Sequence, residues 1–484
     1  EYVMNADEIE IKVGQGAKPG EGGHLPGFKV GPMIAKLRHT QVGIDLISPP
    51  PLHDVYSIED LGRLIADIRA VNPAVRVGVK ITANSGIGAV AVGVAKAGAD
   101  VISISGWEGS TGAAAWSAIE HAGLPLEESL AEAHQALVKN DLRHHVRIRA
   151  DGGLKTGEEI VMMGCLGADE VALGTVNLVA GERCIVCRAC SGQAQGEIRG
   201  ALPECPTGIM AFTEEASKKL GLGAKKAKPE NLLDPEASYA MCKSATKHYN
   251  QLVAEDVRRT LARLGKRNFS EIVGDTGLLE RVYRGGESDR VSMDAILRNV
   301  RENMVKEQAL VTAAQVQKST SRPAVNKANQ YLVDNAATER NLRYSLRTED
   351  RTFGATLAGA IAAGQIKIPD GGFHIETEGY AGQSLGFCLV EGMKMQHTGF
   401  ANDFAFMGAS GGKLSIRQPA EIYSPDNSVA GNTCGYGAQG GEFYAAGRVC
   451  QRFGVRNSGA KIVAEKTGKY PFEYQTGGVT VILQ

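Results

Sequence analysis

Four closely spaced cysteines have the clearest capacity for chemistry in this sequence. They are Cys184, Cys187, Cys190 and Cys205, within GERCIVCRACSGQAQGEIRGALPECPTG. The C-x2-C-x2-C pattern and the later Cys-Pro supply soft thiolates, which suit an iron–sulfur cluster or zinc. The chain has nine cysteines, an odd total with one tight group. That distribution argues against a secreted disulfide framework and indicates a metal or cluster site.

Two glycine turns form a second candidate site. Asp151-Gly152-Gly153 follows one apolar run, and Leu173-Gly174-Thr175 follows the next. Glycine has no Cβ, so phosphate oxygens can reach its backbone N–H group. A single DGG predicts only a tight turn, but two such turns in tandem favour a phosphate site. A nucleotide-like cofactor just before the cysteines would give a redox cluster a use, which makes zinc the weaker alternative.

Lys80 ends the apolar run VGVKI. A cation at that position can stabilise negative charge on a flavin ring or bind the carboxylate of a substrate. A lysine at the end of a strand is more often a solvated charge, so its role depends on the motifs around it.

Six apolar, β-branched runs alternate with helix-like segments before residue 180. The runs are 8–15, 43–50, 76–81, 100–106, 146–153 and 170–175. This alternation predicts a parallel α/β sheet with right-handed crossovers, whose strand ends form a ligand-facing edge. Phosphate sites in TIM barrels commonly lie after strands seven and eight. Read in that way, the two glycine turns imply a (β/α)8 barrel whose first two strands would precede Glu1.

The rest of the chain divides into two further parts. We expect the barrel with its cysteine loop over 1–212, a helical connector over 213–367 and a glycine-rich β domain over 368–484. A long helix is predicted near 238–265, ending at Gly265. In the last part, glycine pairs recur in an imperfect repeat of about twenty to thirty residues. Such repeats favour a right-handed β-helix over a β-sandwich, and we expect a structural or docking role for it.

Composition excludes several classes of function. The 53 basic and 54 acidic residues give a net charge of -1, so no overall positive field would recruit nucleic acid or an anionic membrane. No apolar run approaches the ~18 residues that span a bilayer, and nothing resembles a signal peptide. The sequence therefore predicts a cytoplasmic protein without nucleic-acid or membrane partners.

Longer motifs carry a family resemblance. The segments GQGAKPGEGGHLPGFKV, LISPPPLHDVYSIEDL, ISGWEGSTGA, RADGGLKTGEEIV and GERCIVCRAC resemble the synthase half of glutamate synthase. The tail, with GNTCGYGAQGG and RFGVRNSGA, is similar to the C-terminal glycine-rich β-helix of that family. The resemblance covers almost the whole chain.

The resemblance implies an FMN-bearing barrel that condenses 2-oxoglutarate with ammonia to 2-iminoglutarate. Reduced FMN would then deliver a hydride to give L-glutamate, with electrons arriving through an iron–sulfur cluster. It assigns the FMN phosphate to the turns Asp151–Gly153 and Gly174–Thr175, places Lys80 near the flavin and the oxoacid, and places Gln15 and Lys18 beside the substrate. Cys184, Cys190 and Cys205 match the ligands of a [3Fe–4S] cluster.

Four departures from the family pattern affect these expectations. Cys187 is an additional thiolate that would permit a [4Fe–4S] cluster, and the spacer before Cys205 is longer than usual. Ala83 and Asn84 stand where the family commonly has Ser-Glu. The family's Asp-Gly-Gly-Thr-Gly reads Glu108-Gly109-Ser110-Thr111-Gly112 here. Altered polar groups near the flavin favour an alternative oxoacid or amine as substrate.

The resemblance also implies partners. We expect no cysteine-nucleophile glutaminase domain before the barrel, so that a glutaminase domain or subunit would supply ammonia. Ferredoxin or a subunit that oxidises NAD(P)H would supply electrons, and oligomeric assembly is compatible with the sequence. Two alternatives remain open: a related amino-acid synthase with another substrate, and a non-catalytic electron-transfer or scaffold subunit.

Overall fold

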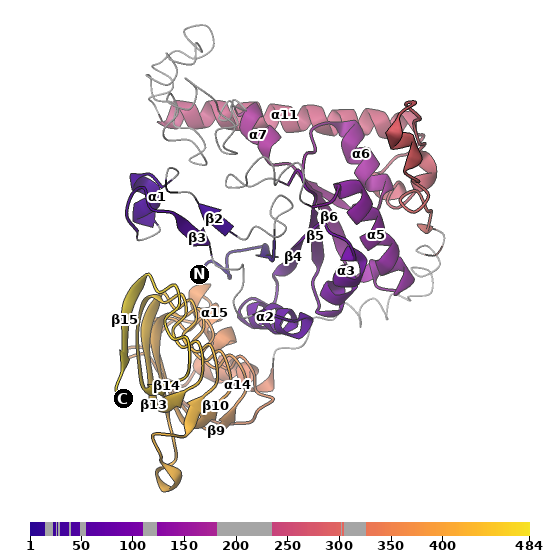
Figure 1. Cartoon of the computed structure of the whole chain (residues 1–484). Helices are drawn as coiled ribbons and strands as arrows, with labels where there is room; N and C mark the ends of the chain where they lie inside the picture. The colour runs from indigo at the N-terminus through magenta and orange to yellow at the C-terminus, as the bar shows by residue number, and fades with distance from the viewer. Residues whose placement is uncertain are drawn as a thin grey trace. The chain divides into compact units, whose positions relative to one another are not determined.

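The structure is a computed structural model. It describes residues 1–14, 23–25, 27, 30–37, 40–48, 55–109, 123–181, 235–301, 303 and 326–484. These residues fall into two compact units (Figure 1). The stacked β unit comprises Glu1–Ile9, Glu59–Arg76 and Ser321–Gln484, and the α/β unit comprises Glu10–Ile58 and Val77–Thr320.

A five-stranded sheet with the order β1-β4-β5-β6-β7 forms the centre of the α/β unit. Its strands are β1 (Glu8–Lys12), β4 (Arg76–Thr82), β5 (Val101–Ser105), β6 (Arg147–Asp151) and β7 (Glu170–Ala172). Strands β4 to β7 are parallel and in register, with Lys80 beside Ser103, Ser103 beside Arg149, and Arg149 beside Glu170. The predicted parallel α/β sheet is confirmed.

The two faces of this sheet differ because side chains alternate along each strand. One face carries Val79, Ile102, Ile104 and Ile148, all fully buried. The helices α3 (Ile87–Lys96), α5 (Leu126–Lys139) and α6 (Gly157–Cys165) gather on one side of the sheet in Figure 1. The opposite face is polar, since the residues in register with Lys80 are Ser103, Arg149 and Glu170.

One of the six predicted strands lies outside this sheet. The run 43–50 contributes β3 (Leu46–Ser48), which pairs antiparallel with β2 (Gly23–Leu25) in a separate two-stranded sheet. The prediction that all six runs form parallel units was therefore wrong for this run. Pro49 and Pro50 follow β3 and have no N–H groups to donate, which disfavours continuing the run as a central strand.

The long helix α11 (Pro235–Arg263) confirms the helix predicted after the connector. Gly265 follows its end with a φ of 69°, a left-handed conformation that suits a helix C-terminus. A small apolar cluster includes Val161 and Cys165 of α6 together with Leu261 of α11 and Ile272. This cluster packs α11 against α6.

Parallel strands of the second unit stack in the order β8-β9-β10-β11-β13-β14-β15, and β12 pairs with β10 and β13. The strands are β8 (Asn341–Leu346), β9 (Phe373–Ala381), β10 (Met393–Ala401), β11 (Ser410–Arg417), β12 (Ser428–Ala430), β13 (Gly440–Val449), β14 (Ser458–Thr467) and β15 (Gly477–Ile482). Every pairing in this sheet is parallel. Stacked parallel strands at the predicted spacing are what a β-helix requires. The sheet begins at β8, within the segment predicted as a helical connector.

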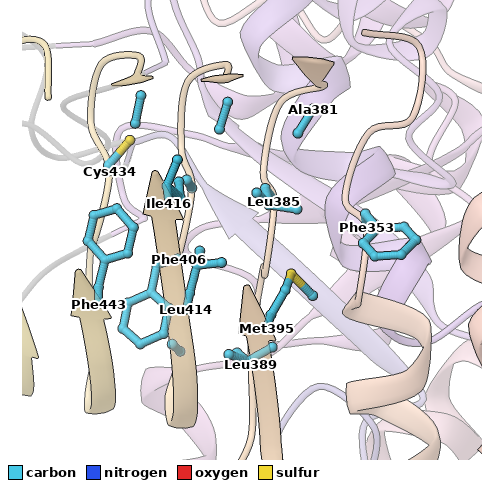
Figure 2. Close-up of a cluster of buried hydrophobic side chains, with 14 of the residues drawn as sticks. Phe353, Ala381, Leu385, Leu389, Met395, Phe406, Leu414, Ile416, Cys434 and Phe443 are labelled. Carbon is cyan, nitrogen blue, oxygen red and sulfur yellow. The ribbon is translucent and has the colours of Figure 1, made fainter. Parts of the chain in front are cut away.

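The interior of the stack is a ladder of apolar side chains (Figure 2). Phe406, Leu414 and Phe443 come from successive coils and are fully buried. The rings of Phe406 and Phe443 stack with their centroids 5.6 Å apart. Alternation along each strand directs these side chains inward and leaves charged residues such as Lys394 and Lys413 outside.

Nearly all of helix α2 (Ile58–Val71) belongs to the stacked β unit, and its buried carboxylate bonds to other segments of that unit. Asp67 is 1% exposed and accepts hydrogen bonds from Thr352 Oγ1 at 2.8 Å and Ser384 Oγ at 2.7 Å. It also pairs with Arg63 at 2.7 Å. Burial raises the pKa of Asp67, and the charge of Arg63 opposes that shift. This network joins the helix to two distant segments of the chain.

Among the helices in the described part of the chain, none is both long enough and apolar enough to cross a membrane.

Candidate functional site

The carboxyl ends of β4, β5, β6 and β7 form one edge of the α/β sheet. Because these neighbouring strands are parallel, the residues that follow them meet at the same edge. The predicted residues Lys80, Asp151, Gly152, Gly153, Gly174 and Thr175 all lie there. The two candidate motifs thus share one edge of the sheet.

Lys80 is paired with Asp151 across the polar face of the sheet. The ammonium group of Lys80 donates to Asp151 Oδ2, and Ser105 Oγ donates to the same oxygen at 3.1 Å. The side chains of Lys80 and Asp151 are 19% and 18% exposed, so the pair is accessible but largely shielded from water. Three neighbouring strands therefore hold this ammonium group at the strand ends, with a carboxylate beside it.

The first glycine turn has a backbone that requires glycine. Gly152 and Gly153 have φ values of 124° and 73°. A Cβ on Gly153 would overlap a carboxylate oxygen of Glu108. An anionic oxygen thus already occupies the space that the missing side chain leaves. The positive φ values are those of glycine, and the side chain of Glu108 packs against the turn.

The second glycine turn is open. Gly174 is exposed and precedes the short helix α7 (Thr175–Ala180). A Cβ built on Gly174 would meet no atom of the described residues within 4 Å. This side of the turn has room for a ligand next to the backbone.

A second group of charged residues lies on the same face of the sheet, where Arg149 precedes Asp151 by two residues along β6. Arg149 donates to Glu170 Oε2 at 2.7 Å, and its other terminal nitrogen lies 3.6 Å from Glu10 Oε1. Ser103 Oγ donates to Glu10 at 2.5 Å. Sequence reasoning missed this network. The signal was present, since polar residues alternate with apolar ones in EIEIK, VISIS and RIRAD.

Ala83 and Asn84, which differ from the family pattern, have different surroundings. Ala83 is fully buried, and its backbone N–H donates to the backbone oxygen of Ser105 at 2.9 Å. Asn84 is exposed. The methyl group of Ala83 therefore fills a packed position where a polar side chain would need a partner.

Six predicted site residues lie outside the described residues. They are Gln15, Lys18, Cys184, Cys187, Cys190 and Cys205. The chain reaches Gln15 from Gly14, which packs against Thr82 at the end of β4. Within the described ranges, five cysteines carry free thiols, and no group of three His, Cys, Asp or Glu side chains is placed to hold a metal ion.

Comparison with known proteins gives two family matches along this chain. Residues 1–240 match the family described as "Conserved region in glutamate synthase". Residues 322–484 match the "GXGXG motif" family. The first match contains the candidate site, and the second contains the stacked strands.

Curated relatives align with the chain over its whole length. The glutamate synthase [NADPH] large chain of Azospirillum brasilense is 41% identical over 490 residues, and that of Bacillus subtilis (strain 168) is 37% identical over 492 residues. The ferredoxin-dependent glutamate synthase 2 of Synechocystis sp. (strain ATCC 27184 / PCC 6803 / Kazusa) is 40% identical over 503 residues. Each alignment covers 100% of this chain but only 30% of the relative.

Among solved structures, a mutant flavocytochrome b2 with benzoylformate aligns with 55% of this chain and 51% of that one. The identity is 14% and the TM-score is 0.28, too low to support an argument.

Proposed function

Because this chain belongs to the glutamate synthase family, we propose that it carries the flavin-binding synthase site of such an enzyme. The reaction would be the reductive amination of 2-oxoglutarate to L-glutamate through 2-iminoglutarate. The observation that carries this proposal is the Lys80–Asp151–Ser105 group at the strand ends, directly before the glycine turn at Gly152 and Gly153.

FMN fits the residues at this edge. Gly152, Gly153, Gly174 and Thr175 would hold its phosphate through backbone N–H groups, and the open side of Gly174 leaves room for it. When bound, FMN would supply the hydride that reduces the imine. Asp151 would contribute by holding Lys80 rather than by touching the phosphate.

Lys80 would supply positive charge next to the flavin and the oxoacid. A fixed ammonium group stabilises a neighbouring anion without reorganising, which is how preorganised sites favour a charged transition state. Asp151, which also accepts a hydrogen bond from Ser105, limits the positions that this group can take. Gln15 and Lys18 would border the oxoacid, and their loop begins beside Thr82 at the end of β4.

Electrons would reach the flavin through an iron–sulfur cluster bound by Cys184, Cys190 and Cys205. Ferredoxin or a subunit that oxidises NAD(P)H would be the donor, since the relatives include ferredoxin-dependent and NADPH-dependent enzymes. A glutaminase domain or subunit would deliver ammonia. We expect the enzyme to act in the cytoplasm.

A second candidate is an amino-acid synthase with another oxoacid or amine. The packed methyl group of Ala83 and the side chain of Glu108 favour it, because both differ from the family pattern near the strand ends. A third candidate is a non-catalytic electron-transfer or scaffold subunit.

The test begins with anaerobically purified protein. We expect one FMN per chain by absorbance, and glutamate formation from 2-oxoglutarate and ammonia with a chemically reduced donor. An alkylamine and a set of other 2-oxoacids serve as competing substrates. Bound FMN with turnover only of another pair would support the second candidate, and bound FMN without turnover the third. A chain without flavin would contradict both synthase proposals.

A further inference from the structure

Helix α11 contacts the segments that follow both glycine turns through two adjacent residues. Tyr249 donates its hydroxyl hydrogen to the backbone oxygen of Lys155 at 2.5 Å, after the turn at Gly152 and Gly153. Asn250 donates its amide hydrogen to Asn177 Oδ1 at 2.7 Å, after the turn at Gly174. The two turns are thus attached to one rigid helix.

Asn177 continues the second connection to the turn itself. Its side-chain amide donates to the backbone oxygen of Leu173 at 2.8 Å. The carbonyl of Leu173 and the N–H of Gly174 belong to one planar trans peptide, so they point in opposite directions. Because the Asn177 amide holds the carbonyl of Leu173, the N–H of Gly174 points away from that amide.

Other bonds keep α11 from shifting along this surface. Asn250 also donates to the backbone oxygen of Thr246 at 2.8 Å, which fixes its amide orientation. Asp256 accepts the backbone N–H of Gly157 at 2.8 Å, at the start of α6. The helix is thus held at the element after the first turn and at the element after the second.

We propose that Tyr249, Asn250 and Asn177 are positioning residues, which set the spacing and direction of the two glycine turns for a phosphate group. This inference rests on the proposed function, because that function supplies the phosphate as part of FMN. None of the three residues needs to touch the ligand. Their effect passes through the backbone of the turns.

The test compares FMN with riboflavin, which has the same ring system but no phosphate. Binding of each to the flavin-free protein is measured by quenching of flavin fluorescence. Tyr249→Phe removes only a hydroxyl group, Asn250→Ala and Asn177→Ala remove the amides, and the exposed neighbour Gln251→Ala is the matched control.

We expect the three variants to bind FMN about five- to tenfold more weakly, the scale of one lost hydrogen bond. Riboflavin affinity and the Gln251→Ala variant should be unchanged. Asn177→Ala and Asn250→Ala should not be additive when combined, because they act through one chain of bonds.

Two results would overturn the inference, and they are distinguishable. If wild-type protein binds FMN and the variants keep its ratio of FMN to riboflavin affinity, only the positioning role fails. If wild-type protein binds no FMN, the proposed function fails with it. Tyr249→Phe keeps the test valid should the alanine variants not fold.

Discussion

Lys80 is the residue whose role depends most on its neighbours. An exposed lysine would be mobile and screened, but Asp151 and Ser105 hold this one in a shielded position. Removing the charge of Lys80 should therefore lower the turnover rate more than the stability of the fold.

Lys80→Met should lower kcat for glutamate formation by about a hundredfold or more, the scale seen when one preorganised group is removed. Flavin should remain bound, because the phosphate turns are intact. Steady-state kinetics and the flavin-to-protein ratio measure both effects. Lys96→Met, at the exposed end of α3, is the control. Full activity in the Lys80 variant would remove this lysine from the site.

His134 is a buried residue outside the candidate site. Its surroundings predict that the stability of the protein depends on pH. Its ring is 2% exposed, and its Nδ1 accepts from Arg143 Nε at 3.1 Å. Burial and then the charge of Arg143 lower its pKa from 6.5 to about 3. The folded protein thus keeps this ring neutral where the unfolded chain would protonate it.

Stability should therefore fall as the pH drops from about 6.5 towards about 3. At pH 5 the loss from this one group is about 2 kcal/mol, since each pH unit in that window is worth about 1.4 kcal/mol. Denaturant unfolding of wild type and His134→Gln between pH 7 and pH 5 measures the difference. His248→Gln, exposed on α11, should behave as wild type. Parallel profiles for wild type and His134→Gln would refute the assignment.

At the scale of elements, the turns between the stacked strands repeat one backbone conformation. Left-handed residues occur at alternate positions in successive coils, as in Thr433, Gly435 and Gly437 and again in Arg452, Gly454 and Arg456. Their N–H groups bond to the next or previous coil, for example Gly437 to Val455 at 2.9 Å and Gly454 to Cys434 at 2.9 Å. The glycine-rich pattern reflects this conformation.

Substitutions at Gly437 can measure the free-energy cost of the left-handed conformation without a contribution from packing. It has a φ of 60°, and a Cβ there would meet no atom within 4 Å. Gly437→Ala should therefore destabilise the chain by about 1–2 kcal/mol through the backbone alone. Gly437→Asn should cost less, because asparagine tolerates the left-handed region. Thermal unfolding ranks the two, and equal losses would point to packing instead.

At the scale of the whole molecule, two family matches cover most of the chain. The second lies within the stacked β unit, whereas the first spans parts of both units. The relatives are more than three times longer than the stretch they share with it. The cluster is the feature that would connect this chain to an electron donor.

We expect three irons per chain, bound by Cys184, Cys190 and Cys205 as in the family it resembles. Cys187→Ser should then leave the iron content unchanged, whereas Cys184→Ser should abolish the cluster. Iron and sulfide analysis with electron paramagnetic resonance measures both. Four irons that fall to three in Cys187→Ser would assign Cys187 as a ligand, and zinc would contradict the cluster.

Much of the architecture was predictable from local pattern. The runs that became β1, β4, β5, β6 and β7 and the helices between them follow from periodicity, because side-chain alternation and helical spacing are properties of short segments. The glycine turns were predictable for the same reason. The run that became β3 was not, because strand partners are chosen by distant segments.

The sequence by itself determined the residue types, the parallel α/β and stacked β architecture, and the motifs that point to the glutamate synthase family. Only the tertiary structure decided which polar side chains meet. The pairing of Lys80 with Asp151, of Arg149 with Glu10 and Glu170, and of Asn177 with Asn250 joins segments that are far apart in the chain. Such pairs depend on strand register and helix packing, and these are set by burial of the whole core rather than by any one segment.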